Sequence, residues 1–169
     1  MNPPILFNPS QNKRVPEPAV PFHHSVELQT RFNDIDMIGH LNNTVYLEFM
    51  DLGKTRYFAD VMGGDIDWHN IGTVVVHIDC DYFAPAFINE PLAVATTVVS
   101  VSVHSFKLEQ RIYNTLTGQV KCIGTTVMAG FDANTNTSVE INPQWVAAFA
   151  AYEGRQLQST RQTTDTDHK

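Results

Sequence analysis

The chain has 169 residues, of which 43% are hydrophobic and 17% charged, and its 11 Lys and Arg against 18 Asp and Glu give a net charge of −7. This balance is typical of a globular domain large enough to bury a core without disulfides, and it excludes an intrinsically disordered chain. No basic run stands out, so the sequence excludes a protein that recognises nucleic acid through a basic surface.

The two cysteines, Cys80 and Cys122, stand in separate segments of alternating apolar residues. They are predicted to be small core residues of a reduced protein, and no Cys or His spacing predicts a metal site or a cofactor. The N-terminus lacks the features of a signal peptide, and no segment approaches the roughly 18 apolar residues of a membrane helix. We therefore expect a cytoplasmic protein without a membrane partner.

Prolines dominate residues 1–22, where six of them block helix and strand interiors. This segment is predicted to be an arm, partly disordered, ahead of a folded domain at residues 23–153. Residues 154–169 are polar and without period, so they are predicted to be a disordered tail. From His24 to Phe32 apolar and polar residues alternate, which predicts a half-buried strand.

A long helix is predicted from about Asn43 to Met62, with Asn42 or Asn43 as its N-cap and Gly63-Gly64 at its end. Apolar residues recur at spacings of three and four over more than half of its circumference. They are Val45, Tyr46, Phe49, Met50, Leu52, Tyr57, Phe58 and Val61. Such a helix is expected to be largely enclosed by a concave partner.

Four alternating segments follow the helix, at residues 73–83, 91–103, 105–113 and 119–131. Short turns between them predict an antiparallel meander. A last helix is predicted from Asn142 as N-cap and Pro143 at its first position to Gly154. One strand, one helix and four strands predict an α+β fold in which a five-stranded antiparallel sheet curls around the long helix.

Acid, base and amide side chains crowd the junction between the first strand and the long helix. Asp34, Asp36 and His40 stand just before Asn42 and Asn43, where the first backbone N–H groups of the helix have no intrahelical partner. Those groups can polarise a carbonyl oxygen, and a carboxylate nearby can attack its carbon or deprotonate a water. The pattern indicates hydrolysis of an activated acyl group such as a thioester, with His40 and Asn43 available to hydrogen-bond the water, the carboxylate or the leaving thiolate.

The stretch RFNDIDMIGHLNNTVYLEFMDLGKTRYF, residues 31–58, resembles the signature of hotdog-fold acyl-CoA thioesterases of the 4-hydroxybenzoyl-CoA thioesterase type. The block VVVHIDCDYFAPAFINEPLAV, residues 74–94, resembles the strand, the aromatic-x-x-Pro bend and the following strand of that family. The resemblance covers roughly residues 25–131 and implies the hotdog fold predicted above.

In that family the second aspartate of the pair is nucleophile or general base, and a backbone N–H at the helix start polarises the thioester carbonyl. By position these roles fall on Asp36 and on the amide of Asn43, whereas His40 occupies a variable place. The resemblance implies a homodimer or homotetramer with the pocket at the subunit interface and acyl-CoA as substrate. The residues predicted to contact the acyl group are Val45, Tyr46, Phe49 and Met50.

Simpler roles exist for several of these residues. Asp36 suits a capping or turn position, Asp34 a turn-stabilising contact, and Tyr46 a core position with a satisfied hydroxyl. A metal site at Asp34, Asp36 and His40 has suitable ligand types but lacks a further ligand at a fitting spacing. Two other functions stay open beside acyl-CoA hydrolysis: a non-catalytic acyl-thioester binding protein, and a thioesterase acting on acyl groups carried by acyl carrier protein.

Overall fold

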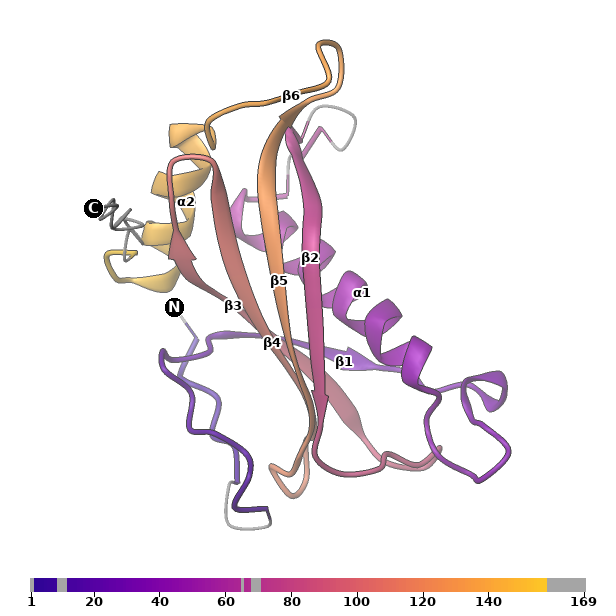
Figure 1. Ribbon diagram of the computed structural model, residues 1–169. Coiled ribbons are helices and arrows are strands. Elements are labelled where there is room, and N and C mark those ends of the chain that lie inside the picture. Colours follow the sequence, from indigo (N-terminus) through magenta and orange to yellow (C-terminus); the bar gives the residue numbers. More distant parts are fainter. Residues whose placement is uncertain (1, 9–11, 65, 68–70, 158–169) are drawn as a thin grey trace, which may run out of the picture.

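The computed structural model describes residues 2–8, 12–64, 66–67 and 71–157 (Figure 1). The chain forms β1 (His24–Leu28), the 3-10 turn η2 (Phe32–Asp34), helix α1 (Asn43–Val61), strands β2 (Thr73–Tyr82), β3 (Leu92–Val101), β4 (Ser105–Asn114), β5 (Val120–Asp132) and β6 (Thr137–Ser138), and helix α2 (Pro143–Glu153). The element order predicted from the sequence is therefore confirmed, with η2 and β6 added. The predicted meander holds only for β3, β4 and β5, because β2 pairs with β5 and not with β3.

The sheet is antiparallel throughout and has the strand order β1-β3-β4-β5-β2, while β6 pairs with the end of β5. The predicted count of five strands is corrected to six, because the chain reverses after β5 and Thr137 and Ser138 pair with its last residues. A two-residue strand carries no alternating pattern of its own, so the sequence did not indicate it. β2 forms one end of the strand order, and among the described residues its outer edge has no partner.

Helix α1 lies across one face of the sheet (Figure 1) and approaches it closely at Gly53, where an added Cβ would stand 2.7 Å from a methyl group of Val94. The side chain of Gln110 donates to the backbone oxygen of Met50 at 2.7 Å, so the sheet also contacts the helix by a buried hydrogen bond. The expected enclosure of the helix is only partial. Leu47 and Leu52 point away from the sheet and are 41% and 39% exposed, because the sheet curls over one side of α1 only.

The ends of α1 are set by the residues that the sequence indicated. Asn42 is the N-cap, and its side chain accepts from the backbone N–H of Thr44 at 3.1 Å. Beyond the last turn, Gly63 and Gly64 both have positive φ, which glycine adopts without steric cost. Helix α2 likewise has Asn142 as N-cap, Pro143 at its start and Gly154 in the left-handed region at its end.

An aromatic core fills the space between the C-terminal half of α1, helix α2 and the sheet. Phe149 of α2 is fully buried, and its ring lies 5.1 to 6.1 Å from those of Phe106, Trp145, Phe58 and Tyr57. Part of the predicted tail belongs to this end of the molecule, since Arg155 donates to the backbone oxygen of Val98. Residues 158–169 of that tail lie outside the described residues.

The described residues of the N-terminal arm pack on the opposite face of the sheet. Phe22 and Val15 are buried against Ala93 and Ala95 of β3, whereas the alternate residues Leu92 and Val94 pack with α1. Residues 2–8 and 12–22 of the predicted arm thus include apolar side chains that pack on an apolar sheet face. The arm leaves the α1 face free to form the site.

Candidate functional site

A tight loop joins the first strand to α1 and holds the polar cluster. Ile35 and Leu41 form an isolated antiparallel bridge, and the Asp36 N–H donates to the backbone oxygen of His40 at 2.8 Å. Gly39 turns the chain with φ of 85°, a conformation that a residue with a Cβ adopts only under strain. The loop therefore closes on itself within seven residues.

The Asp36 carboxylate is oriented by this loop. Its Oδ1 accepts from the backbone N–H groups of Ile38 at 2.9 Å and His40 at 3.0 Å. Its Oδ2 accepts no hydrogen bond from the described residues, and the side chain is half-buried. Asp36 thus has both the turn role expected of an aspartate here and one carboxylate oxygen available for chemistry.

Asp34 has only the simpler role. Its Oδ2 accepts from the Arg31 N–H at 2.6 Å and closes the 3-10 turn, while its backbone oxygen accepts from the Asn42 N–H at 2.8 Å. The turn-stabilising role expected for Asp34 is confirmed. The backbone hydrogen bond from Asn42 to Asp34 connects the N-cap of α1 to the chain that enters the loop.

The first turn of α1 presents a backbone donor beside Asp36. The N-cap side chain occupies the Thr44 N–H, and the Val45 N–H donates to the Asn42 oxygen at 3.0 Å. Within the described part of the chain the Asn43 N–H has no acceptor. It stands at the positive end of a helix of 19 residues, which favours a developing negative charge.

Asp36, Asn43 and His40 line one cavity of about 480 Å³ together with Tyr46. Its opposite wall comes from the end of β2 and the bend after it, and consists of Tyr82, Phe83, Ala84 and Pro85. These wall residues lie outside the set of site residues predicted from the sequence. The signal available for them was the aromatic-x-x-Pro bend, Tyr82 to Pro85.

Two tyrosines connect the wall to the helix. The Tyr82 hydroxyl donates to the backbone oxygen of Asn43 at 3.2 Å, and its ring meets that of Tyr46 edge-on at 5.2 Å. Burial raises the pKa of Tyr82 to about 12, and burial also raises the pKa of Tyr46 above its ordinary value of 10.0. Both phenols therefore stay protonated and neutral at physiological pH.

His40 borders the cavity with its ring edge-on to Phe87, at 5.3 Å between centroids. The described residues offer its ring nitrogens no hydrogen bond, so its part in the chemistry stays a prediction.

Of the four residues predicted to contact the acyl group, Tyr46 lines this cavity. Val45 and Met50 belong to the core between α1 and the sheet, and Phe49 lines a separate hollow beside Leu52. The helix positions alternate between cavity and core because α1 turns by about 100° per residue. Acyl contacts by Val45, Phe49 and Met50 stay a prediction.

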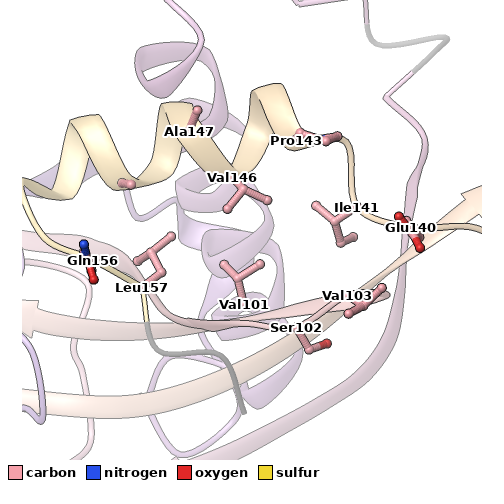
Figure 2. A pocket seen from close by; sticks show the side chains of 11 residues that line it. Val101, Ser102, Val103, Glu140, Ile141, Pro143, Val146, Ala147, Gln156 and Leu157 are labelled. Carbon is pink, nitrogen blue, oxygen red and sulfur yellow. The ribbon is translucent and has the colours of Figure 1, made fainter. Parts of the chain in front are cut away.

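A larger cavity, of about 620 Å³, lies between α2 and the turn that joins β3 to β4 (Figure 2). Val101, Val103, Ile141 and Val146 point into it, and Glu140 stands at its rim (Figure 2). Its walls are mainly apolar, and they offer neither a carboxylate paired with a free helix N–H nor a histidine. The cavity beside Asp36 is therefore the candidate site.

Predictions from the sequence about metal ligands, membrane helices and cysteines can be compared with the structure. Among the described residues no three His, Cys, Asp or Glu side chains converge as a metal site would require. In the same part of the chain no helix is long and apolar enough to cross a membrane. Cys80 and Cys122 are free thiols, with 3.8 Å between their sulfur atoms.

Comparison with known proteins agrees with the fold. Residues 30–149 match the thioesterase-like superfamily. Long-chain acyl-CoA thioesterase FadM of Escherichia coli K12 is 26% identical over 118 residues, which are 68% of this chain and 88% of that protein. A thioesterase from Thermus thermophilus, solved with coenzyme A and Zn, is 26% identical with a TM-score of 0.72 and covers 80% of this chain and 98% of its own.

A 1,4-dihydroxy-2-naphthoyl-CoA thioesterase from Synechocystis shares the fold, with a TM-score of 0.68 at 20% identity over 75% of this chain and 95% of its own. The superfamily match covers the loop, α1, strands β2 to β5 and most of α2, and so includes every residue of the candidate site. The predicted thioesterase family is confirmed, and the chain belongs to the thioesterase-like superfamily.

Proposed function

We propose that this protein hydrolyses acyl-CoA thioesters at the cavity between Asp36 and the start of α1. The observation that carries the proposal is the pairing of one carboxylate oxygen without a protein partner and one backbone N–H without an acceptor, among the described residues, in the lining of a single cavity. Relatives that act on acyl-CoA or were solved with coenzyme A support the substrate class.

In the proposed reaction the thioester carbonyl oxygen accepts from the Asn43 N–H, where the helix end stabilises the charge that develops on it. Asp36 Oδ2 removes a proton from water, and the resulting hydroxide adds to the carbonyl carbon. Collapse of the tetrahedral intermediate breaks the C–S bond and releases the CoA thiolate and the free acid. Alternatively, Asp36 attacks the carbon directly, the C–S bond breaks with release of the CoA thiolate, and water then hydrolyses the resulting mixed anhydride to the free acid and the Asp36 carboxylate. His40 borders the same space, within the region that a leaving thiolate would cross.

The decisive experiment measures thiol release from acyl-CoAs of varied chain length and aromaticity with a thiol-trapping reagent. Asp36→Asn keeps an oxygen that accepts from Ile38 and His40, so the loop is preserved while the base is lost. We expect kcat to fall by about a hundredfold or more. The matched control is Asp34→Asn, which alters a carboxylate on the same loop and leaves kcat within about twofold, because that carboxylate only closes a turn.

The same assays distinguish acyl-CoA hydrolysis from acyl-thioester binding and from hydrolysis on acyl carrier protein. Unchanged turnover in Asp36→Asn would contradict the assignment of the base. Saturable binding of acyl-CoA without thiol release from the unaltered protein indicates a binding protein, and turnover of acyl groups only on acyl carrier protein indicates that carrier. Single-turnover hydrolysis in ¹⁸O-water separates the two mechanisms, since only the anhydride route places the label in the Asp36 carboxylate.

We propose further that the protein works as a homodimer joined along β2. Val74, Val75, Val76 and Ile78 of this edge strand, which is unpaired among the described residues, are 38% to 58% exposed, and Met37 and Ile38 of the catalytic loop are 104% and 74% exposed. A second copy pairing its own β2 with this edge would cover these apolar residues. Light scattering after gel filtration tests the dimer. Val76→Lys is expected to give monomers, and the dimer is contradicted if the unaltered protein is itself monomeric.

A further inference from the structure

Among the lysines and arginines that the structure describes, two are almost completely buried, Arg111 at 1% exposure and Lys121 at 2%. A buried charge destabilises the fold unless it is paired and hydrogen-bonded. Arg111 contacts Glu109 at 2.8 Å and donates to the Pro16 oxygen, so its partners lie on the arm face of the sheet, away from the candidate site. The partners of Lys121 lie elsewhere, in the bend that forms the cavity wall.

Lys121 occupies an irregular position on β5. The pairing of β4 with β5 shifts between Ile112, opposite Cys122, and Tyr113, opposite Val120, so Lys121 is the extra residue of a β-bulge. A bulge turns a side chain out of the regular alternation of the strand. Here it lets the long side chain reach the bend after β2 instead of pointing to the arm face or to α1.

All three wall residues of the bend are hydrogen-bonded to this one residue. The Lys121 oxygen accepts from the N–H groups of Phe83 at 2.8 Å and Ala84 at 3.3 Å. Its Nζ donates to the Pro85 oxygen at 2.9 Å and to Glu90 Oε1 at 2.8 Å. The second carboxylate oxygen of Glu90 accepts from the Phe87 N–H at 3.2 Å, so the ion pair spans the bend from Pro85 to Glu90.

The bend in turn contacts the catalytic junction at Ala86. The Leu41 N–H donates to the Ala86 oxygen at 2.8 Å. Leu41 is buried and lies between the Asp36 loop and the N-cap of α1. A displacement of the bend therefore moves the segment that separates the carboxylate from the Asn43 N–H.

We propose that the buried Lys121–Glu90 ion pair is a positioning element of the thioester site, which holds the bend of residues 83–90 and through Ala86 sets the relative position of Asp36 and the Asn43 N–H. This inference rests on the proposed function for its meaning in catalysis. Lys121 and Glu90 are positioning residues, since neither lines the cavity. Misplacement of reacting groups by about 1 Å is enough to lower turnover by up to about a hundredfold.

Two matched pairs of variants test the inference. Lys121→Met removes the buried cation at the bend, and Arg111→Met removes the other buried cation. Glu90→Gln and Glu109→Gln remove the negative charges of the partner carboxylates, which are 23% and 18% exposed. These milder variants replace the first pair in the test if Lys121→Met or Arg111→Met does not fold. We expect the variants at residues 121 and 90 to lower kcat and kcat/KM together, by about tenfold to a hundredfold, and those at 111 and 109 to leave kcat unchanged.

Unchanged kcat in both Lys121→Met and Glu90→Gln would overturn the inference, and so would an equal loss in the control variants at matched stability. A second readout does not need activity: amide hydrogen exchange of Leu41 under native conditions should accelerate in Lys121→Met and not in Arg111→Met. If the unaltered protein hydrolyses no acyl-CoA, the proposed function fails, and the exchange result alone then decides: unchanged Leu41 exchange overturns the coupling of bend to loop, and faster exchange supports it.

Discussion

The two ends of helix α1 have opposite surroundings. Its C-terminal half is sealed by aromatic rings from α1, α2 and the sheet, with Tyr57 and Phe58 almost inaccessible to solvent. Its N-terminus stands at the cavity beside Asp36, where an amide and a carboxylate oxygen lack partners among the described residues. Unpaired polar groups near a cavity do not stabilise the fold, whereas buried rings do. One end of the helix thus stabilises the fold, and the other end is where we propose the chemistry.

The largest effect on stability is expected from Phe149→Ala at the sealed end. The ring is fully buried among four others, and its removal leaves a cavity that should lower the free energy of unfolding by about 3–5 kcal/mol. Urea denaturation measures the loss, and kcat of the folded fraction should not change. Leu47→Ala, at a site 41% exposed on the outer side of α1, is the control and should change stability by no more than about 0.5 kcal/mol. A fall in kcat of the folded fraction in Phe149→Ala would contradict the claim that this end of α1 affects stability and not turnover.

A buried hydrogen bond at the C-terminal half of α1 is expected to give the next largest effect on stability. The Tyr57 hydroxyl donates to Glu153 Oε1 at 2.5 Å, and Glu153 is 4% exposed with no hydrogen bond to Oε2 among the described residues. Tyr57→Phe removes the donor and leaves a buried carboxylate without it, which should cost about 2 kcal/mol. Glu153→Gln combined with Tyr57→Phe should cost less than the sum of the single variants. Additive losses in thermal or urea unfolding would show that the two groups are not coupled.

The N-caps of the two helices can be compared directly, because replacing either is expected to lower the free energy of unfolding by the same amount. Asn42 and Asn142 each accept from the N–H two residues further along, at 3.1 and 2.9 Å. Replacement of either by Ala should lower the free energy of unfolding by about 1 kcal/mol. Only Asn42→Ala releases the Thr44 N–H and loosens the helix start that holds the Asn43 N–H. Only this variant is therefore expected to lower kcat as well. Equal kcat in the two variants would contradict the assignment of the Asn43 N–H.

The smallest effect concerns pH. Burial lowers the pKa of His24 below its ordinary value of 6.5, although Asp60 at 3.2 Å acts in the opposite direction. The unfolded chain then binds a proton at a pH where the folded protein does not, so the contribution of His24 to stability is present above pH 6.5 and falls as the pH drops below it. Unfolding by urea at several pH values measures this slope. His24→Asn should flatten it, and an unchanged slope would assign it to other groups.

Sequence patterns predicted most of the secondary structure because local rules govern it. The period of apolar residues predicted α1 and the strands, and the Asn caps and the glycines after each helix predicted the helix ends. The crowding of Asp36, His40 and Asn43 at a helix start predicted the site, since a loop that closes within seven residues is also local. The packing of the arm on the sheet and the strand β6 were not predicted, because the first depends on a distant apolar face and the second on a reversal of the chain.

The sequence by itself determined the α+β class, the long helix and the place of the carboxylate, because side-chain period, capping and loop chemistry act between neighbours in the chain. Only the tertiary structure decided which residues surround that carboxylate. Tyr82 to Pro85 and the buried pair of Lys121 and Glu90 come from segments more than 40 residues downstream, and a bulge in β5 aims the lysine. Such contacts follow from strand register and burial, which no local pattern specifies.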